Sequence, residues 1–197
     1  AELADHEFPD EEFLVDPIIP LGGNTLVYGE PEVGKTMFLN TLSATFNNGL
    51  PLFGRWETTK GSCVVMQADM GGQIQQRRLI KSLEEINLSD TYWLTAEDGS
   101  TPLINILKLP LTQRHLVEQI QDEIDPVAVH WDSLRRVHTL PENASETPSA
   151  IVNAAEKIAP HATNLFYHHT RKKSQDPDAL RHDEETFLGH QHIRSHM

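Results

Sequence analysis

The segment from Gly29 to Thr36 holds the residues best suited to chemistry. It reads Gly29-Glu30-Pro31-Glu32-Val33-Gly34-Lys35-Thr36 and matches in full the phosphate-binding loop pattern G-x-x-x-x-G-K-[ST]. In such a loop, backbone N–H groups point at the phosphates of a nucleotide. The Lys35 ammonium reaches the β- and γ-phosphates, and the Thr36 hydroxyl binds Mg²⁺. All eight residues are therefore candidates for binding ATP, with Thr36 as a metal ligand.

Three more polar residues stand at the ends of apolar runs and are candidate catalytic residues together with Lys35. Asp132 follows the run 126–131, and a carboxylate in that position beside a phosphate loop holds Mg²⁺, usually through water. Asp69 can orient or deprotonate the water that attacks the γ-phosphate, although Asp-x-Gly-Gly is also turn chemistry. His168 can hydrogen-bond the γ-phosphate and report its loss to the loop that follows.

Strands and helices alternate around these residues. Apolar, β-branched and aromatic runs predict strands at 24–28, 62–67, 91–94, 126–131 and 163–167, with a short irregular one at 103–107. Apolar residues at helical spacing predict helices at 37–46, 73–86, 112–124 and 147–159, the second with Ile74, Leu79, Leu83 and Ile86 inward. The alternation predicts an α/β fold with a mainly parallel sheet flanked by helices. Sites in such folds lie at the C-terminal ends of the strands, which places the loop, Asp69, Asp132 and His168 along one edge.

Length and composition bound the organisation of the chain. The 197 residues suit one ATPase domain at 21–169, after an acidic arm at 1–20 and before a polar, mobile loop or truncated end at 170–197. A single cysteine, Cys63, excludes a disulfide framework. No apolar run approaches the ~18 residues that cross a membrane, and the N-terminus is acidic rather than basic. We therefore expect a cytoplasmic protein with no membrane partner.

The charge pattern bears on nucleic-acid binding. The formal net charge of -13 argues against strong DNA binding by the isolated domain, but leaves room for a few basic loops. The one dense basic run, Arg171-Lys172-Lys173, can contact phosphates of single-stranded DNA, and a solvated loop is an equal alternative. Arg135 and Arg136 closely follow the Asp132 strand and can pair with acidic residues, cross a subunit interface, or do neither. The histidines from 161 to 196 lack the recurrent spacing of zinc ligands.

Four stretches together resemble the RecA-type P-loop ATPase core, and more closely the RepA-like and DnaB-like hexameric replicative helicases. They are residues 28–36, 64–69, 132–138 with 142–145, and 166–172. The resemblance implies a RecA-like ATPase domain in a hexameric ring, with nucleotide at subunit interfaces and single-stranded DNA in the centre. It makes Lys35 and Thr36 ligands of phosphate and Mg²⁺, Asp132 the second carboxylate at Mg²⁺, and His168 the γ-phosphate sensor.

The chain departs from this family in three respects. Asp69 stands where the family usually has Glu, so the base is one methylene short and we expect slow turnover. Leu188 stands where the family has an Arg that acts across the interface, and the family core continues with more strands. Two alternatives therefore stay open: an ATP-dependent regulator or recombination accessory of the same fold without unwinding, and a non-catalytic nucleotide-binding interaction module.

Overall fold

The centre of the fold is a five-stranded sheet in which every neighbouring pair of strands is parallel. The computed structural model describes residues 10–82, 88–94, 104–141 and 144–169. The strands are β3 (Asn24–Gly29), β4 (Cys63–Gln67), β5 (Thr91–Leu94), β6 (Ala128–Asp132) and β7 (Thr163–His169), and they lie in the order β3-β7-β6-β4-β5. The predicted α/β fold with a mainly parallel sheet is confirmed.

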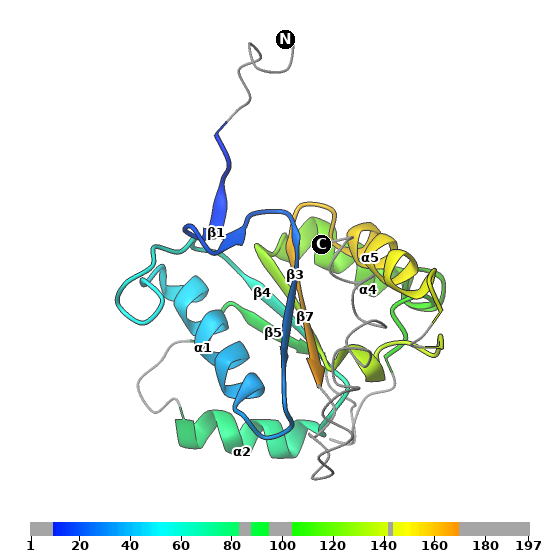
Figure 1. The fold of residues 1–197 in the computed structure, drawn as a ribbon, viewed down its shortest axis with the longest axis horizontal. Helices are drawn as coiled ribbons and strands as arrows, with labels where there is room; N and C mark the ends of the chain where they lie inside the picture. The colour runs from blue at the N-terminus through cyan, green and yellow to red at the C-terminus, as the bar shows by residue number, and fades with distance from the viewer. Residues whose placement is uncertain (1–9, 83–87, 95–103, 142–143, 170–197) are drawn as a thin grey trace, which may run out of the picture.

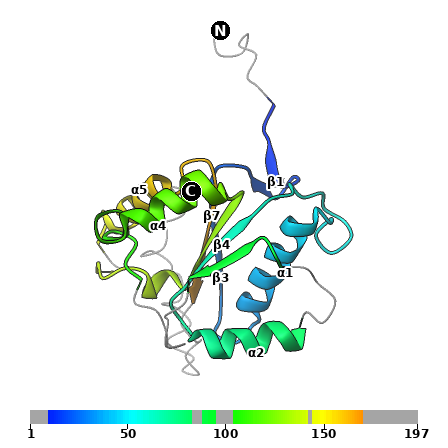
Figure 2. The same ribbon diagram turned by 180° about the vertical axis from the view of Figure 1, so that it is seen from behind.

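Helices cover both faces of the sheet (Figures 1 and 2). The helix α1 (Lys35–Asn48) packs on one face, and α4 (Arg114–Glu118) and α5 (Thr147–Ile158) cover the other. The helix α2 (Gly72–Ser82) lies across the end of α1 at which α1 begins. The phosphate loop, which joins β3 to α1, is therefore next to the start of α2.

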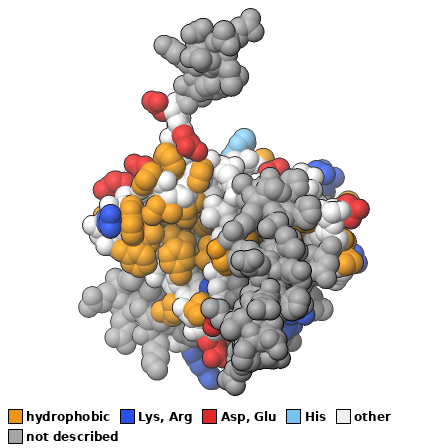
Figure 3. Space-filling model, in the orientation of Figure 1, with side chains coloured by type: hydrophobic (Ala, Val, Ile, Leu, Met, Phe, Trp, Pro, Cys, Tyr) orange, Lys and Arg blue, Asp and Glu red, His pale blue; other side chains and the backbone are white. Residues whose placement is uncertain are grey.

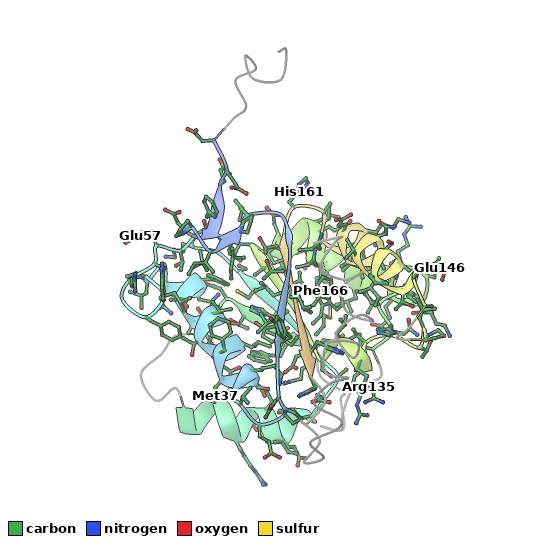
Figure 4. All side chains as sticks on the ribbon, in the orientation of Figure 1. Met37, Glu57, Arg135, Glu146, His161 and Phe166 are labelled. Atoms are coloured by element: carbon green, nitrogen blue, oxygen red, sulfur yellow. The ribbon has the colours of Figure 1, made fainter. Side chains whose placement is uncertain are left out.

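The strands feed two hydrophobic cores because successive side chains point to opposite faces of a sheet. On β4, Val64 and Met66 belong to the core under α5, whereas Cys63 and Val65 belong to the core under α1. Figure 4 shows Phe166 of β7 between the sheet and the helices on the α5 side. Burial on both faces explains why these strands read as continuous apolar runs.

A buried polar network crosses the core under α1. The His130 ring of β6 shares hydrogen bonds with the Tyr167 hydroxyl at 2.9 Å and with Ser43 Oγ of α1 at 3.3 Å. Burial lowers the pKa of His130 to about 3 and raises the pKa of Tyr167 well above its ordinary value. Both groups are therefore neutral at pH 7, and their hydrogen bonds tie α1 to two central strands.

The last part of the segment predicted as an acidic arm at 1–20 forms a small hairpin. Strands β1 (Phe13–Val15) and β2 (Ile19–Pro20) pair antiparallel. Leu14 and Val15 are fully buried in the core under α1, and this burial holds the hairpin against the domain. Residues 1–9 of the arm lie outside the described residues.

The helix predicted at 112–124 is broken into three pieces. It begins earlier, as α3 (Leu109–Thr112) with Pro110 in its first turn, a position that needs no N–H donor. Gln113, at φ -134° and ψ 51°, interrupts it before α4. The last piece is a π-helix, η1 (Gln119–Ile124). The predicted helix at 147–159 agrees with α5 to within one residue.

Two other local predictions need correction. The irregular strand predicted at 103–107 is not a strand over 104–107, and Leu103 lies outside the described residues. In α2, Ile74 was expected to face inward but is 51% exposed, whereas the polar Gln75 is 3% exposed. The reason is that Gln75 faces α1 and hydrogen-bonds Asn40 there. The predicted continuation of α2 to residue 86 also lies outside the described residues.

One face of the domain exposes apolar side chains. Figure 3 shows hydrophobic side chains gathered on the side of the molecule where α1 lies. An aromatic cluster includes Phe38 of α1: the Phe53 ring lies 6.3 Å from the rings of both Phe38 and Trp56, and the Arg55 guanidinium lies 4.9 Å from the Trp56 ring. Leu50 and Phe53 are exposed. Contiguous apolar surface of this kind is typical of interaction surfaces.

Candidate functional site

The C-terminal ends of four parallel strands bring the candidate residues to one edge of the sheet. Strand β3 leads into the phosphate loop, β4 into Asp69, β6 ends at Asp132, and β7 ends with His168 and His169. The register aligns Gln67 with Asp132. Figure 4 shows Met37, in the first turn of α1, and Arg135, just after β6, toward this edge, and His161 at the opposite edge.

The loop has the backbone geometry of an anion site. Gly34 has a φ of 96° and Glu32 a φ of 68°, both in the left-handed region. Gly34 caps α1 without any side-chain hydrogen bond, and the first turn of α1 holds no acidic residue. The N–H groups at the start of this 14-residue helix are therefore not taken by a side-chain cap, and the helix dipole favours an anion there.

Lys35 is folded back onto the loop. Its Nζ donates hydrogen bonds to the carbonyl oxygens of Gly29 at 2.9 Å and Glu30 at 2.7 Å. Only 8% of Lys35 is exposed. Burial lowers its pKa, and the negative charges of Asp132 and Asp69 oppose this effect. The ammonium is therefore hydrogen-bonded to the loop and near enough to the two acidic groups to feel their charge, and a phosphate can replace its carbonyl partners.

Thr36 and Asp132 form the candidate metal site. Asp132 Oδ2 accepts hydrogen bonds from Thr36 Oγ1 at 3.2 Å and from Gln67 Nε2 at 2.9 Å. Burial, and next the charge of Asp69, raises the pKa of Asp132, while its hydrogen bonds to Gln67 and Thr36 lower it. A hydroxyl and a carboxylate are the hard oxygen ligands that Mg²⁺ prefers.

Gln67 provides an independent test of whether Mg²⁺ fits here. Its side-chain Oε1 is buried and has no hydrogen-bond partner among the described residues. Buried acceptors are normally satisfied by protein or ordered water, and Mg²⁺ usually keeps several water ligands when it binds to proteins. Water held by Mg²⁺ can donate to Gln67 Oε1. The residues present therefore fit a hydrated magnesium ion.

Asp69 lies at the same edge, but its carboxylate already has two partners. Its Oδ1 is 3.5 Å from Nε of Arg136, which belongs to the short 3₁₀ helix η2 (Leu134–Arg136). Its Oδ2 is 3.4 Å from Nε2 of His169. Of the alternatives left open for Arg136, the geometry favours pairing with an acidic residue. Asp69 is a third exposed, so water reaches it.

His168 is buried at the end of β7, and the register aligns it with Tyr28, directly before the phosphate loop. This position is compatible with the predicted role as γ-phosphate sensor, which stays a prediction. The predicted DNA contacts at Arg171, Lys172 and Lys173 lie outside the described residues, as does Leu188.

Sequence reasoning missed three participants in the site: Gln67, His169 as a partner of Asp69, and the specific pairing of Arg136. The signal for Gln67 was its position, because it precedes Asp69 by two residues and ends a buried strand. The contacts of Arg136 and His169 with Asp69 join residues 67 and 100 positions apart. Only the order and register of the strands make such contacts visible.

Comparison with known proteins gives the family. No curated protein matches the sequence. None of the helices in the described part of the chain has the length and apolar character needed to cross a bilayer. A protein-family model described as an AAA domain matches residues 1–175, which is most of the chain and includes every residue of the site above. The chain therefore belongs to the AAA domain family of P-loop ATPases.

Proposed function

We propose that the chain binds ATP with Mg²⁺ at the C-terminal edge of its sheet and hydrolyses the bond between the β- and γ-phosphates. The observation that carries this proposal is the hydrogen bond between Thr36 Oγ1 and Asp132 Oδ2, 3.2 Å long and joining residues 96 positions apart. It places the end of the phosphate loop beside a buried carboxylate. That is the arrangement that P-loop ATPases use to hold Mg²⁺.

Each residue has a distinct task in this proposal. The N–H groups at the start of α1 and the Lys35 ammonium bind the phosphates, while Thr36 and Asp132 are the residues that would hold the metal. Bound Mg²⁺ supplies charge neutralisation at the phosphate oxygens. Asp69 orients the attacking water and accepts its proton, and Arg136 and His169 hold the Asp69 carboxylate in place. His168 reports the state of the γ-phosphate to the chain that follows β7.

The finer proposal is that this domain works as part of a RepA-like replicative helicase, in a ring with single-stranded DNA at its centre. The resemblance of the four stretches supports it. The exposed aromatic cluster around Phe53 supports self-association, because apolar surface of this kind is commonly buried at interfaces. The net charge of -13 favours the alternative of an ATP-dependent regulator that does not unwind DNA.

The test is ATP turnover with and without single-stranded DNA, in the wild-type chain and in Lys35→Ala. We expect Lys35→Ala to lower turnover about 100-fold to 1,000-fold, as loss of one electrostatic contact to the transition state does elsewhere. Lys60→Ala is the matched control, because Lys60 lies against Gly49, at the far end of α1 from the loop.

Three outcomes separate the candidate functions. Turnover that rises with single-stranded DNA supports the helicase, and turnover indifferent to DNA supports the regulator. ATP binding without turnover would refute hydrolysis and leave the interaction module. A size measurement with and without ATP tests the ring, and a monomer under both conditions would contradict it.

A further inference from the structure

A buried pair of amide side chains joins the two helices that begin at the site. Asn40 lies on α1 and Gln75 on α2, and they are 1% and 3% exposed. Gln75 Nε2 donates a hydrogen bond to Asn40 Oδ1 at 3.3 Å. Figures 1 and 2 both show α2 lying against the beginning of α1. The pair is thus a direct polar link between these helices, and neither residue has a role in the ATP site described above.

Both side chains keep an unused polar atom. Asn40 Nδ2 and Gln75 Oε1 are buried and have no hydrogen-bond partner among the described residues. These atoms are a donor and an acceptor, so the pair makes one of the two hydrogen bonds that facing carboxamides can form. Apolar side chains of similar size would fill the same space without unsatisfied polar atoms. The amides therefore require an explanation other than packing.

The positions of the two residues supply that explanation. Asn40 lies four residues after Thr36, one helical turn along α1, on the same side of the helix. Gln75 lies six residues after Asp69, and the Gly71 carbonyl between them accepts hydrogen bonds from the Ile74 and Gln75 N–H groups at 3.1 and 3.2 Å. The chain from Asp69 to Gln75 is therefore a short, hydrogen-bonded segment.

We propose that Asn40 and Gln75 are positioning residues for ATP hydrolysis. Their hydrogen bond sets the distance between the helix that carries Lys35 and Thr36 and the segment that carries Asp69. A general base acts only within hydrogen-bond reach of its water, and Asp69 has a side chain one methylene shorter than Glu. The helix-to-helix link keeps the segment that carries this short carboxylate in place, while Arg136 and His169 contact the carboxylate itself. This inference rests on the proposed hydrolysis, with Asp69 as the base.

Asn40→Ala and Gln75→Ala test the inference through the split between kcat and KM. We expect kcat to fall about 10-fold to 100-fold in each, because small displacements of catalytic groups have effects of this size. Affinity for a fluorescent ATP analogue, measured by titration, is expected to stay within about 2-fold of wild type, since the loop contacts of Lys35 do not involve either amide. The reciprocal swap Asn40→Gln with Gln75→Asn keeps the summed side-chain length and is expected to restore most of kcat.

The matched control removes a different buried hydrogen bond from the same helix. Thr91 Oγ1 donates to Asn47 Oδ1 at 2.6 Å, near the opposite end of α1. Thr91→Val is expected to lower the free energy of unfolding, measured in urea, while kcat stays at the wild-type value. If Asn40→Ala does not fold, Gln75→Ala carries the test, because it leaves α1 intact.

The outcomes distinguish this inference from the proposed function. If wild type hydrolyses ATP and Asp69→Asn does not, but Asn40→Ala and Gln75→Ala keep full kcat, the positioning role is wrong and hydrolysis stands. A loss of kcat in Thr91→Val equal to that in Gln75→Ala would also overturn the positioning role, because any weakening of α1 would then suffice. If wild type binds ATP without turnover, both fail together.

Discussion

Acidification is expected to destabilise the domain through His130. This ring is fully buried between α1, β6 and β7, and it is hydrogen-bonded to Tyr167 and Ser43. Burial lowers its pKa from the ordinary 6.5 to about 3. The unfolded chain therefore binds a proton at this position between about pH 6.5 and pH 3, where the folded chain does not.

The sign and size of the pH effect on the free energy of unfolding follow from this difference in pKa. The pKa of this base is lower in the folded chain than in the unfolded chain. Its full contribution to the free energy of unfolding is therefore present above the unfolded pKa, and this contribution is lost as the pH falls below 6.5. Between pH 8 and pH 5 the loss is about 2 kcal/mol, which is a large part of the stability of an ordinary domain. The raised pKa of Asp132 acts in the opposite direction, because the folded state then binds the proton more readily.

The measurement is urea unfolding at pH 8 and pH 5 for wild type and for His130→Gln. Glutamine keeps a donor and an acceptor for Ser43 and Tyr167 but does not titrate. Comparing the two pH dependences cancels every other titrating group, including Asp132. We expect the wild type to lose about 2 kcal/mol more than His130→Gln over this range, whatever the absolute stability of the variant.

An equal pH dependence of the free energy of unfolding in the two proteins would refute the reasoning. It would mean that the imidazole is protonated as easily in the fold as in the unfolded chain, which full burial opposes. A larger loss in His130→Gln than in wild type would reverse the sign, and would require the fold to stabilise a charged ring.

Substitutions at three positions of the site give further predictions. Gln67→Leu removes the donor at 2.9 Å from Asp132 Oδ2, so the Mg²⁺ concentration needed for half-maximal turnover is expected to rise about 10-fold to 100-fold in a metal titration. An unchanged Mg²⁺ requirement would show that Gln67 does not support the metal site. Gly34→Ala places a Cβ in the left-handed region at φ 96°, so urea unfolding is expected to show a loss of about 1–2 kcal/mol; an unchanged stability would contradict the backbone geometry. Asp69→Asn is expected to lower kcat about 100-fold or more with ATP affinity unchanged, whereas Asp69→Glu is expected to retain activity. Full activity in Asp69→Asn would show that Asp69 takes no part in the mechanism.

Those parts of the fold that depend on local patterns could be predicted from the sequence. Strands β4, β6 and β7 are buried on both faces, so their apolar runs stand out from the polar helices and loops. The phosphate loop is contiguous, and a rule about strand ends then located Asp69, Asp132 and His168. These inferences need only the local chain and the knowledge that parallel strands end at one edge.

Those parts that depend on tertiary packing could not be predicted. An inward helix face is ordinarily apolar, so Ile74 seemed the buried residue of α2 and the buried Gln75 was missed. Leu14 and Val15 lie in an acidic, proline-containing segment, and only their contact with the core under α1 makes that segment a hairpin. The partners of Asp69 depend on the order of the strands and on the turn after β6, which no local pattern encodes.

Burial of opposite charges at one edge explains how the site can favour a ligand as highly charged as ATP with Mg²⁺. Burial lowers the pKa of Lys35 and raises the pKa of Asp132, so the fold disfavours the charged form of each group. Lys35 has exchanged water for two loop carbonyls, and the two groups that donate hydrogen bonds to Asp132, the Thr36 hydroxyl and the Gln67 amide, are both neutral. Phosphate beside Lys35 and a divalent cation beside Asp132 would bring an opposite charge into direct contact with each of these two buried groups. The two ligands should therefore bind with positive coupling, each strengthening the other, and ATP without Mg²⁺ should raise the free energy of unfolding less than the two together.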